Sequence, residues 1–320
     1  MTDRVLSVRH LLGIDGLTRA DAELILDTAR SFHEVNTRAL KKVPVLRGRT
    51  VALLFFENST RTRLSFELAA KRLSADTLSF SASGSSVSKG ETLIDTARNI
   101  EAMGPDLVVM RHEQSGAHQL LLRAMSGAII NAGDGQHEHP TQALLDAFTL
   151  LERFGRAPKD GLHGKTVAII GDIAHSRVAR SNMLLLPMLG AKVRVCGPRT
   201  MLPLGLEQYG VEATDDVDGA LDGVDAVMTL RIQKERISGA RMASDRDYFH
   251  RFGLTMERFL RLPERALVMH PGPINRGVEI DHDVADHPRA VILEQAENGV
   301  AVRMAVLYLL AVVHAKAERA

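Results

Sequence analysis

The stretch TVALLFFENSTRTR at residues 50–63 passes from one structural pattern to another. Residues 50–56 form a β-rich apolar run, and a helical pattern begins after Ser59. Three hydroxyl side chains and two guanidinium groups fall within the five residues 59–63. Unpaired backbone N–H groups and the positive end of the helix dipole favour an anion at a helix N-terminus. The stretch therefore predicts a strand, a turn and a helix whose first turn binds phosphate without the glycines of a P-loop.

A helix cap is the alternative interpretation of the same residues. Ser59 and Thr60 would then only satisfy backbone groups, and Arg61 and Arg63 would lie on solvated surface. Capping requires a single hydroxyl, however, and it does not explain two arginines at a two-residue spacing. We therefore favour the anion site.

The change between short β-rich runs and helical patterns repeats along the chain. This alternation is typical of α/β proteins with parallel sheets and crossover helices. Further β-rich runs lie at residues 107–110, 128–131, 166–170, 192–196, 226–230 and 266–269. One helix is expected to begin near Thr18, which forms a capping-box pair with Asp21. Two more are expected, one from Pro140 and one over residues 294–315. The stretch FGRAPKDGLHGK at residues 154–165 is rich in glycine, proline and charge and separates two such arrays. We therefore predict two doubly wound parallel-sheet domains that divide there.

The composition is that of an ordinary globular protein. The 320 residues include 40 Lys+Arg and 39 Asp+Glu, a formal charge of +1, and 45% are hydrophobic. This balance requires no polyanion, so we expect no nucleic acid partner, and no apolar stretch reaches the ~18 uncharged residues of a membrane span. The first residues carry charges where a signal peptide has its apolar core, and the single Cys196 allows no internal disulfide. We therefore expect a cytoplasmic protein that does not bind membranes.

A second motif, NAGDGQHEHPTQ at residues 131–142, runs from a strand end through a glycine-rich loop into a helix. His137, Glu138 and His139 are candidate metal ligands, but the HExxH spacing and a cysteine pair are both absent, so we predict no metal. Open parallel sheets bind ligands at the carboxyl ends of their strands. We therefore expect the His139 ring at this edge, beside the helix that follows Ser59. A histidine that only caps the helix remains an open alternative.

These two motifs resemble those of the carbamoyltransferase family, and the matches run from about Phe55 to the C-terminal helix. Residues 59–63 resemble its carbamoyl phosphate signature, HPTQ at residues 139–142 its second element, and Met110-Arg111-His112 its third. The resemblance implies three groups of carbamoyl phosphate ligands: Ser59, Thr60, Arg61 and Thr62 for the phosphate, Arg111, His139 and Thr62 for the carbonyl, and Gln142 for the amino group. The catalytic residues that it implies are Arg61, Thr62, Lys89, Arg111 and His139.

The second domain resembles carbamoyltransferases that act on aspartate. Gly171-Asp172 followed by Arg177 is similar to the segment that binds the α-carboxylate, and Arg231 with Gln233 to the segment that binds the β-carboxylate. An aspartate dianion suits guanidinium groups, and Lys89 would add a third cation. HPGPINRG at residues 270–277 lacks the cysteine that ornithine enzymes carry there. The resemblance also implies a cis bond between Gly272 and Pro273, whose turn aims main-chain carbonyls at the carbamoyl amino group.

The loop from Ser85 to Thr92 is similar to a mobile loop of the family, which carries Ser85 and Lys89 into the site of a neighbouring subunit. The resemblance therefore implies a homotrimer with shared active sites. One of two lysines common in this loop is replaced by Ser88. A flexible surface lysine is the alternative for Lys89. Glu57 resembles an acidic residue that pairs with Arg177 and Arg236 across the two domains.

By resemblance the chain transfers the carbamoyl group of carbamoyl phosphate to L-aspartate, a committed step of pyrimidine synthesis, without a cofactor. Residues 1–152 would bind carbamoyl phosphate, residues 153–293 would bind aspartate, and residues 294–320 would form a C-terminal helix that returns to the first domain. The alternatives are transfer to another amine such as ornithine, or a non-catalytic homologue that scaffolds a dihydroorotase. A regulatory chain or a dihydroorotase is a candidate partner. A nicotinamide site at residues 171–176 is disfavoured because GxGxxG is absent.

Overall fold

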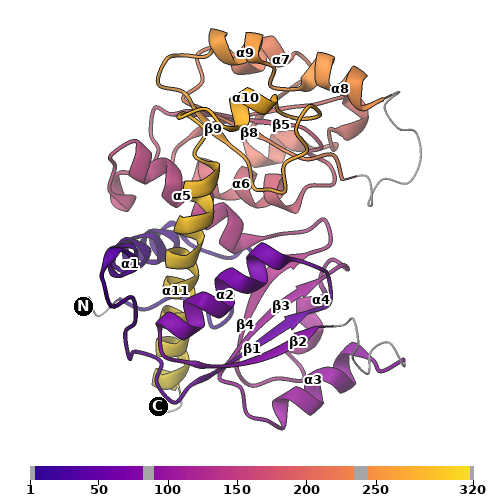
Figure 1. The fold of residues 1–320 in the computed structure, drawn as a ribbon. Helices are drawn as coiled ribbons and strands as arrows, with labels where there is room; N and C mark the ends of the chain where they lie inside the picture. Colours follow the sequence, from indigo (N-terminus) through magenta and orange to yellow (C-terminus); the bar gives the residue numbers. More distant parts are fainter. Residues whose placement is uncertain (1–3, 82–89, 234–243, 318–320) are drawn as a thin grey trace. The chain divides into compact units, whose positions relative to one another are not determined.

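The computed structural model describes residues 4–81, 90–233 and 244–317, and the chain divides into two compact units (Figure 1). Unit 1 comprises residues 1–148 and 296–320, and unit 2 comprises residues 149–295. Each unit contains one sheet, and within the described residues all paired strands run parallel. The predicted α/β fold with two parallel-sheet domains is confirmed.

Unit 1 contains a four-stranded sheet in the order β2-β1-β3-β4. Its strands are β1 (Thr50–Phe55), β2 (Asp76–Ser81), β3 (Leu107–His112) and β4 (Ala128–Asp134). Its helices are α1 (Arg19–Thr37), α2 (Thr60–Arg72), α3 (Leu93–Glu101), α4 (Ala117–Leu121) and most of α5 (Pro140–Arg153). From β1 the chain proceeds to β2 on one side of the sheet, and β3 and β4 are then added on the other side of β1. The direction of strand addition therefore reverses between β1 and β3.

The central strands of unit 1 are buried on both faces, as is usual for parallel strands between layers of helices. Residues 51–55 of β1 are each at most 4% exposed. One face, which includes Leu54 and Met110, packs against α3 and α4. Strand β2 was not predicted, because its residues 76–81 mix polar and apolar side chains at the sheet edge, where Leu78 is 37% exposed. Edge strands lack the continuous apolar sequence that identified β1.

Unit 2 contains a five-stranded sheet in the order β7-β6-β5-β8-β9. Its strands are β5 (Thr166–Ile170), β6 (Lys192–Cys196), β7 (Glu212–Thr214), β8 (Ala226–Thr229) and β9 (Leu267–Met269). Its helices are α6 (Arg177–Met188), α7 (Val217–Leu221), α8 (Asp245–Phe252), α9 (Met256–Arg261) and α10 (His282–Ala285). Here the strand order reverses between β5 and β8. The short edge strand β7 was not predicted either.

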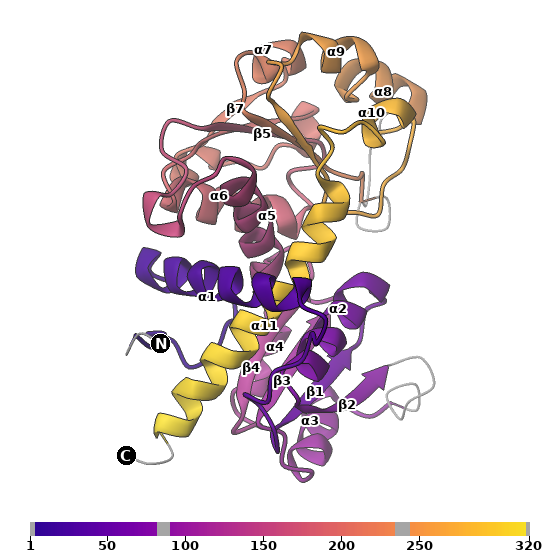
Figure 2. The same ribbon diagram turned by 60° about the vertical axis from the view of Figure 1, so that its left-hand side comes forward.

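The long helix α11 (Ile292–Ala317) begins in unit 2 and continues into unit 1. In unit 1 its Tyr308 ring lies 5.8 Å from the ring of Phe32 in α1, and Figure 2 shows α1 crossing in front of α11. The predicted return of the C-terminal helix to the first domain is confirmed. The helix is long and apolar enough to cross a membrane, but 67% of its most apolar window is buried inside the protein. This burial is typical of a helix in a protein core.

Candidate active site

The phosphate cradle, residues 59–63, lies where β1 ends and α2 begins. Ser59 is the N-cap residue of α2 with an extended backbone, yet its side chain makes no capping hydrogen bond to the described part of the chain. The first turn of the helix contains no acidic residue, and Thr62 is only 7% exposed. The Ser59 hydroxyl therefore does not act as the helix cap that the alternative interpretation requires. The arrangement favours an anion at the N-terminus of α2.

Arg111 lies at the carboxyl end of β3, beside the end of β1. The two strands pair Phe55 with Arg111, and the Arg111 side chain is 12% exposed. Its Nη1 donates to the carbonyl of Ala132 at 3.3 Å, and its Nη2 donates to Oε1 of Glu57 at 3.2 Å. The guanidinium is thus fixed at the point where the strand order reverses. Glu57 supplies its counter-charge within unit 1, and its expected pairing with residues of the second domain stays a prediction.

His139 and Gln142 lie at the start of α5, which begins at Pro140 as predicted. The His139 backbone carbonyl accepts from the N–H groups of Gln142 at 2.9 Å and Ala143 at 3.3 Å, so it forms the first hydrogen bonds of the helix. The His139 side chain is 4% exposed and Gln142 is 8% exposed. Nε2 of Gln142 donates to Oδ1 of Asp146, one turn later, at 2.9 Å. Asp146 was not among the predicted site residues.

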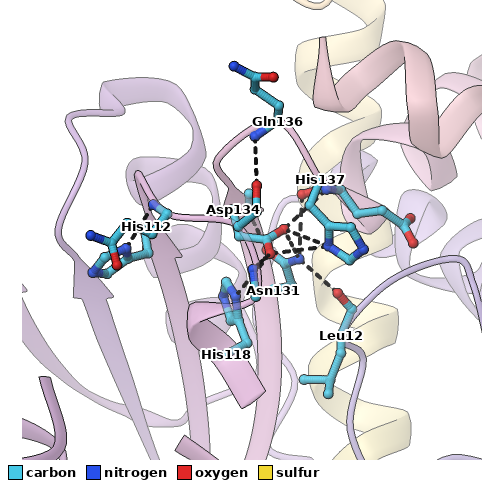
Figure 3. A network of polar contacts seen from close by, with 12 residues as sticks. Leu12, His112, His118, Asn131, Asp134, Gln136 and His137 are labelled. Atoms are coloured by element: carbon cyan, nitrogen blue, oxygen red, sulfur yellow. Dashed lines mark hydrogen bonds and ion pairs between the residues drawn. The ribbon is translucent and has the colours of Figure 1, made fainter. Parts of the chain in front are cut away.

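Asp134 organises the loop that leads to His139 (Figure 3). Its Oδ1 accepts from Nδ2 of Asn131 at 2.8 Å and from the backbone N–H of Glu138 at 3.1 Å, and its Oδ2 accepts from the N–H of Gly116 at 2.7 Å. His137 Nδ1 lies 3.2 Å from Oδ2. Burial alone raises the pKa of Asp134, but these hydrogen bonds outweigh it and lower the pKa to about 2. The carboxylate is therefore charged at neutral pH.

Two further buried groups are hydrogen-bonded near this loop, His118 to β3 and Glu138 to the segment before α1. His118 donates from Nε2 to the carbonyl of Met110 at 2.7 Å, and burial lowers the pKa of His118 to about 4, so its ring is neutral at pH 7. Glu138, 1% exposed, accepts from the backbone N–H groups of Ile14 at 2.7 Å and Asp15 at 3.2 Å. The segment before α1 and the loop before α5 are thus tied together by a buried carboxylate.

In unit 2, the loops after β5 and β8 meet at the reversal of strand order. Gly171 has a φ of +141°, and a Cβ there would lie 2.7 Å from the carbonyl oxygen of Leu230. Only glycine permits this approach without displacing the backbone. The buried Asp172 completes the contact, since its Oδ1 lies 2.7 Å from Nδ1 of His175 and its Oδ2 accepts from the N–H of Gln233 at 3.2 Å. The predicted α-carboxylate and β-carboxylate segments are therefore brought together.

The three predicted aspartate ligands of unit 2 lie on these two loops. Arg177 begins α6 and is 4% exposed. Arg231 donates from Nη2 to Oε1 of Gln233 at 3.2 Å, and Nε2 of Gln233 donates to the Arg231 carbonyl at 3.4 Å. These two hydrogen bonds hold the Arg231 and Gln233 side chains in a fixed position relative to each other. Arg177 and Arg231 thus follow two neighbouring strands, β5 and β8, and guanidinium groups are suitable ligands for the carboxylates of a dicarboxylate.

The loop at residues 270–277 follows β9 and contains a cis Gly272–Pro273 bond, which confirms that prediction. The Gly272 N–H donates to Nδ1 of His270 at 2.7 Å, so the ring hydrogen is on Nε2, which donates to Oε1 of Glu279 at 3.0 Å. Glu279 also accepts from the N–H of Asn275 at 2.6 Å. The loop is therefore held by a buried histidine and a buried carboxylate, neither of which the sequence analysis assigned a role.

Some of the predicted site residues are not described by the structure. Ser85, Lys89 and Arg236 lie outside the described residues, so their roles stay predictions. Among the residues that the structure describes, no group of three or more His, Cys, Asp or Glu side chains is arranged to hold a metal ion.

Two family models match the chain over its two sheets. Residues 9–152 match the carbamoyl-P binding domain of aspartate/ornithine carbamoyltransferases, and residues 163–310 match their Asp/Orn binding domain. The chain belongs to the aspartate/ornithine carbamoyltransferase family. The residues that the resemblance implies as ligands lie within the two matched regions, and their roles as ligands stay predictions.

Proteins with similar sequences include aspartate carbamoyltransferase catalytic subunits. The chain is 57% identical over 302 residues to the aspartate carbamoyltransferase catalytic subunit of Syntrophotalea carbinolica, covering 94% of this chain and 95% of the relative. It is also 57% identical to that of Acidothermus cellulolyticus over 303 residues, covering 95% and 92%.

Solved structures of both kinds of enzyme share the fold. Aspartate transcarbamoylase from Trypanosoma cruzi, in complex with N-(phosphonacetyl)-L-aspartic acid, has a TM-score of 0.84 at 32% identity, covering 93% of this chain and 94% of that one. Ornithine carbamoyltransferase from Thermus thermophilus has a TM-score of 0.82 at 27% identity, covering 95% and 99%. The fold alone therefore does not separate the two acceptors, whereas sequence identity favours aspartate.

Replacing Asp134 by asparagine should reduce stability in a pH-dependent way. The folded-state pKa lies below the unfolded value, so the carboxylate stabilises the fold above pH 4, by about 2 kcal/mol, and this contribution is lost as the pH falls toward 2. Urea unfolding should therefore show Asp134→Asn about 2 kcal/mol less stable at pH 7, with the difference roughly halved at pH 3. The exposed control Glu113→Gln should match the parent at both pH values. A difference that does not change with pH would contradict a role for the charge.

Proposed function

We propose that this carbamoyltransferase transfers the carbamoyl group of carbamoyl phosphate to L-aspartate, giving N-carbamoyl-L-aspartate and phosphate in pyrimidine synthesis. One observation carries the choice of acceptor: Asp172 holds the Arg231–Gln233 pair against the loop that leads to Arg177. Two guanidinium groups favour a dianionic amino acid and repel the side-chain cation of ornithine.

The chemistry requires no nucleophile from the protein, because carbamoyl phosphate is already activated. The protein contributes positioning and the stabilisation of negative charge that develops on the carbonyl oxygen and on the leaving phosphate. We assign the phosphate to residues 59–62, the carbonyl oxygen to Arg111, His139 and Thr62, and the amino group to Gln142 and the turn at Gly272 and Pro273. The departing phosphate accepts the proton that the aspartate amine loses.

We further propose that the active form is a homotrimer with shared sites. Leu64 and Leu68 on α2 are 52% and 40% exposed, and Leu78 on the edge strand β2 is 37% exposed. Exposed leucines one helical turn apart, beside an open sheet edge, suit contact with a second copy of this chain. Lys89 follows β2 closely in the sequence, so the same contact would bring Lys89 to a neighbouring site.

A cytoplasmic location is also part of the proposal. It rests on the cysteine content, since a single cysteine allows no internal disulfide. That residue, Cys196, is fully buried, and burial raises the pKa of its thiol to about 12. Such a thiol is unreactive, as predicted for a packed core residue.

The proposed activity is tested by phosphate release from carbamoyl phosphate with each acceptor. We expect turnover with L-aspartate and none above background with L-ornithine. Release that is faster with ornithine would establish the alternative acceptor, and release with neither amine would leave a non-catalytic homologue.

The acceptor site is tested by Arg231→Ala. Loss of a charge-assisted ligand should raise the KM for aspartate about 100-fold, while the affinity for carbamoyl phosphate changes by less than about threefold. Arg199→Ala removes a surface arginine of the same unit, whose side chain is 85% exposed, and should leave both constants unchanged. Equal weakening of both substrates in Arg231→Ala would contradict the assignment of aspartate to unit 2.

The shared site is tested by complementation between two inactive variants. Lys89→Ala and His139→Ala should each lose nearly all turnover. When the two are dissociated and reassembled, some interfaces combine an intact His139 with an intact Lys89 from the next chain, and activity should return. Hybrid trimers verified by native mass spectrometry that stay as inactive as their parents would exclude the shared-site arrangement.

A further inference from the structure

A buried carboxylate determines how the Gln142 side chain is oriented. Asp146 is fully buried, and its Oδ1 accepts from Nε2 of Gln142 at 2.9 Å. A carboxylate offers only acceptors, so the Gln142 amide must turn its NH2 group toward Asp146. The amide oxygen of Gln142 is then the atom directed to a ligand.

This orientation matches the chemistry of a carbamoyl group. Its amino group is a donor and its lone pair is delocalised into the carbonyl, so it needs an acceptor. The Gln142 oxygen meets that need. With the amide reversed, two NH2 groups would face each other, and one donor would be left unsatisfied in a buried site.

The negative charge of Asp146 is balanced by a buried arginine of α11. Arg303 is 4% exposed, and burial lowers its pKa to about 10, while attraction by Asp146 acts in the opposite direction. The guanidinium therefore stays charged at pH 7. Its Nη1 donates to Oγ of Ser65 at 2.8 Å, and its central carbon lies 5.1 Å from the centre of the Phe66 ring. Arg303 thus links α11 to α2, the helix that begins with residues 60–63.

We propose that Asp146 is a positioning residue that fixes the Gln142 amide with its oxygen toward the carbamoyl amino group. The pair thereby makes the site select an amino group over a methyl group of similar size. This proposal rests on the proposed function, since it assumes that carbamoyl phosphate is the ligand of Gln142.

The test compares two acyl phosphates that differ only at that group. Acetyl phosphate carries a methyl group where carbamoyl phosphate carries NH2. In Asp146→Asn, the new amide satisfies Gln142 in either orientation, so the preference for oxygen toward the ligand is lost. Calorimetric titration should show carbamoyl phosphate binding about tenfold more weakly than to the parent, the effect of one hydrogen bond, and acetyl phosphate changing less than about twofold.

Two further variants separate orientation from stability. Asp146→Asn combined with Arg303→Met removes both buried charges, so it avoids leaving Arg303 without its counter-charge, and it should show the same loss of preference. Asp21→Asn alters another buried carboxylate of unit 1, which accepts from Ser7 and Thr18. It should keep the preference of the parent.

The outcomes distinguish the two proposals. If both acyl phosphates weaken equally in the Asp146 variants, or if the parental preference survives in them, Asp146 has no orienting role and the inference is overturned. The same holds if the parent itself does not prefer carbamoyl phosphate to acetyl phosphate. Failure of the proposed function is separate, since it appears as the absence of phosphate release with aspartate in the parent.

Discussion

In each unit the candidate site residues depend on a reversal of strand order, between β1 and β3 in unit 1 and between β5 and β8 in unit 2. Where the order of a parallel sheet reverses, the connections from two neighbouring strands leave toward opposite faces, and a crevice opens at their carboxyl ends. The cradle and Arg111 occupy this position in unit 1, and the loops with Asp172 and Arg231 occupy it in unit 2. The sheets therefore fix where charged groups from distant segments converge.

Buried carboxylates hold these loops in place. Asp134, Asp172 and Glu279 are each at most 1% exposed, and each accepts from at least one backbone N–H of a strand-end loop. A carboxylate suits this role because its two oxygens accept several hydrogen bonds without needing a donor in return. The low pKa of Asp134 shows that the hydrogen bonds outweigh the effect of burial there.

Much of the fold was predictable because its signals are local. β5 and β6 have the predicted bounds, and α5 begins at Pro140, because continuous apolar runs and a helix-starting proline are read within a few residues. The cradle was recognisable for the same reason. The contacts of Asp146 with Gln142 and of Arg303 with Ser65 were not predicted, and the second joins residues from opposite ends of the chain. Such pairs leave no periodic pattern in the sequence, and Lys89 and Arg236 lie outside the described residues.

The path of α11 has a consequence for synthesis on the ribosome. Unit 2 is continuous in sequence, whereas unit 1 needs residues 296–320, which are translated last. All of unit 2 has therefore been synthesised before Arg303 and Tyr308 are added to the chain. Until then unit 1 lacks the helix that packs against α1 and α2. The first half of the chain to be translated is thus the second to complete its core, so a truncated chain would have a whole acceptor domain but an unfinished phosphate-binding one.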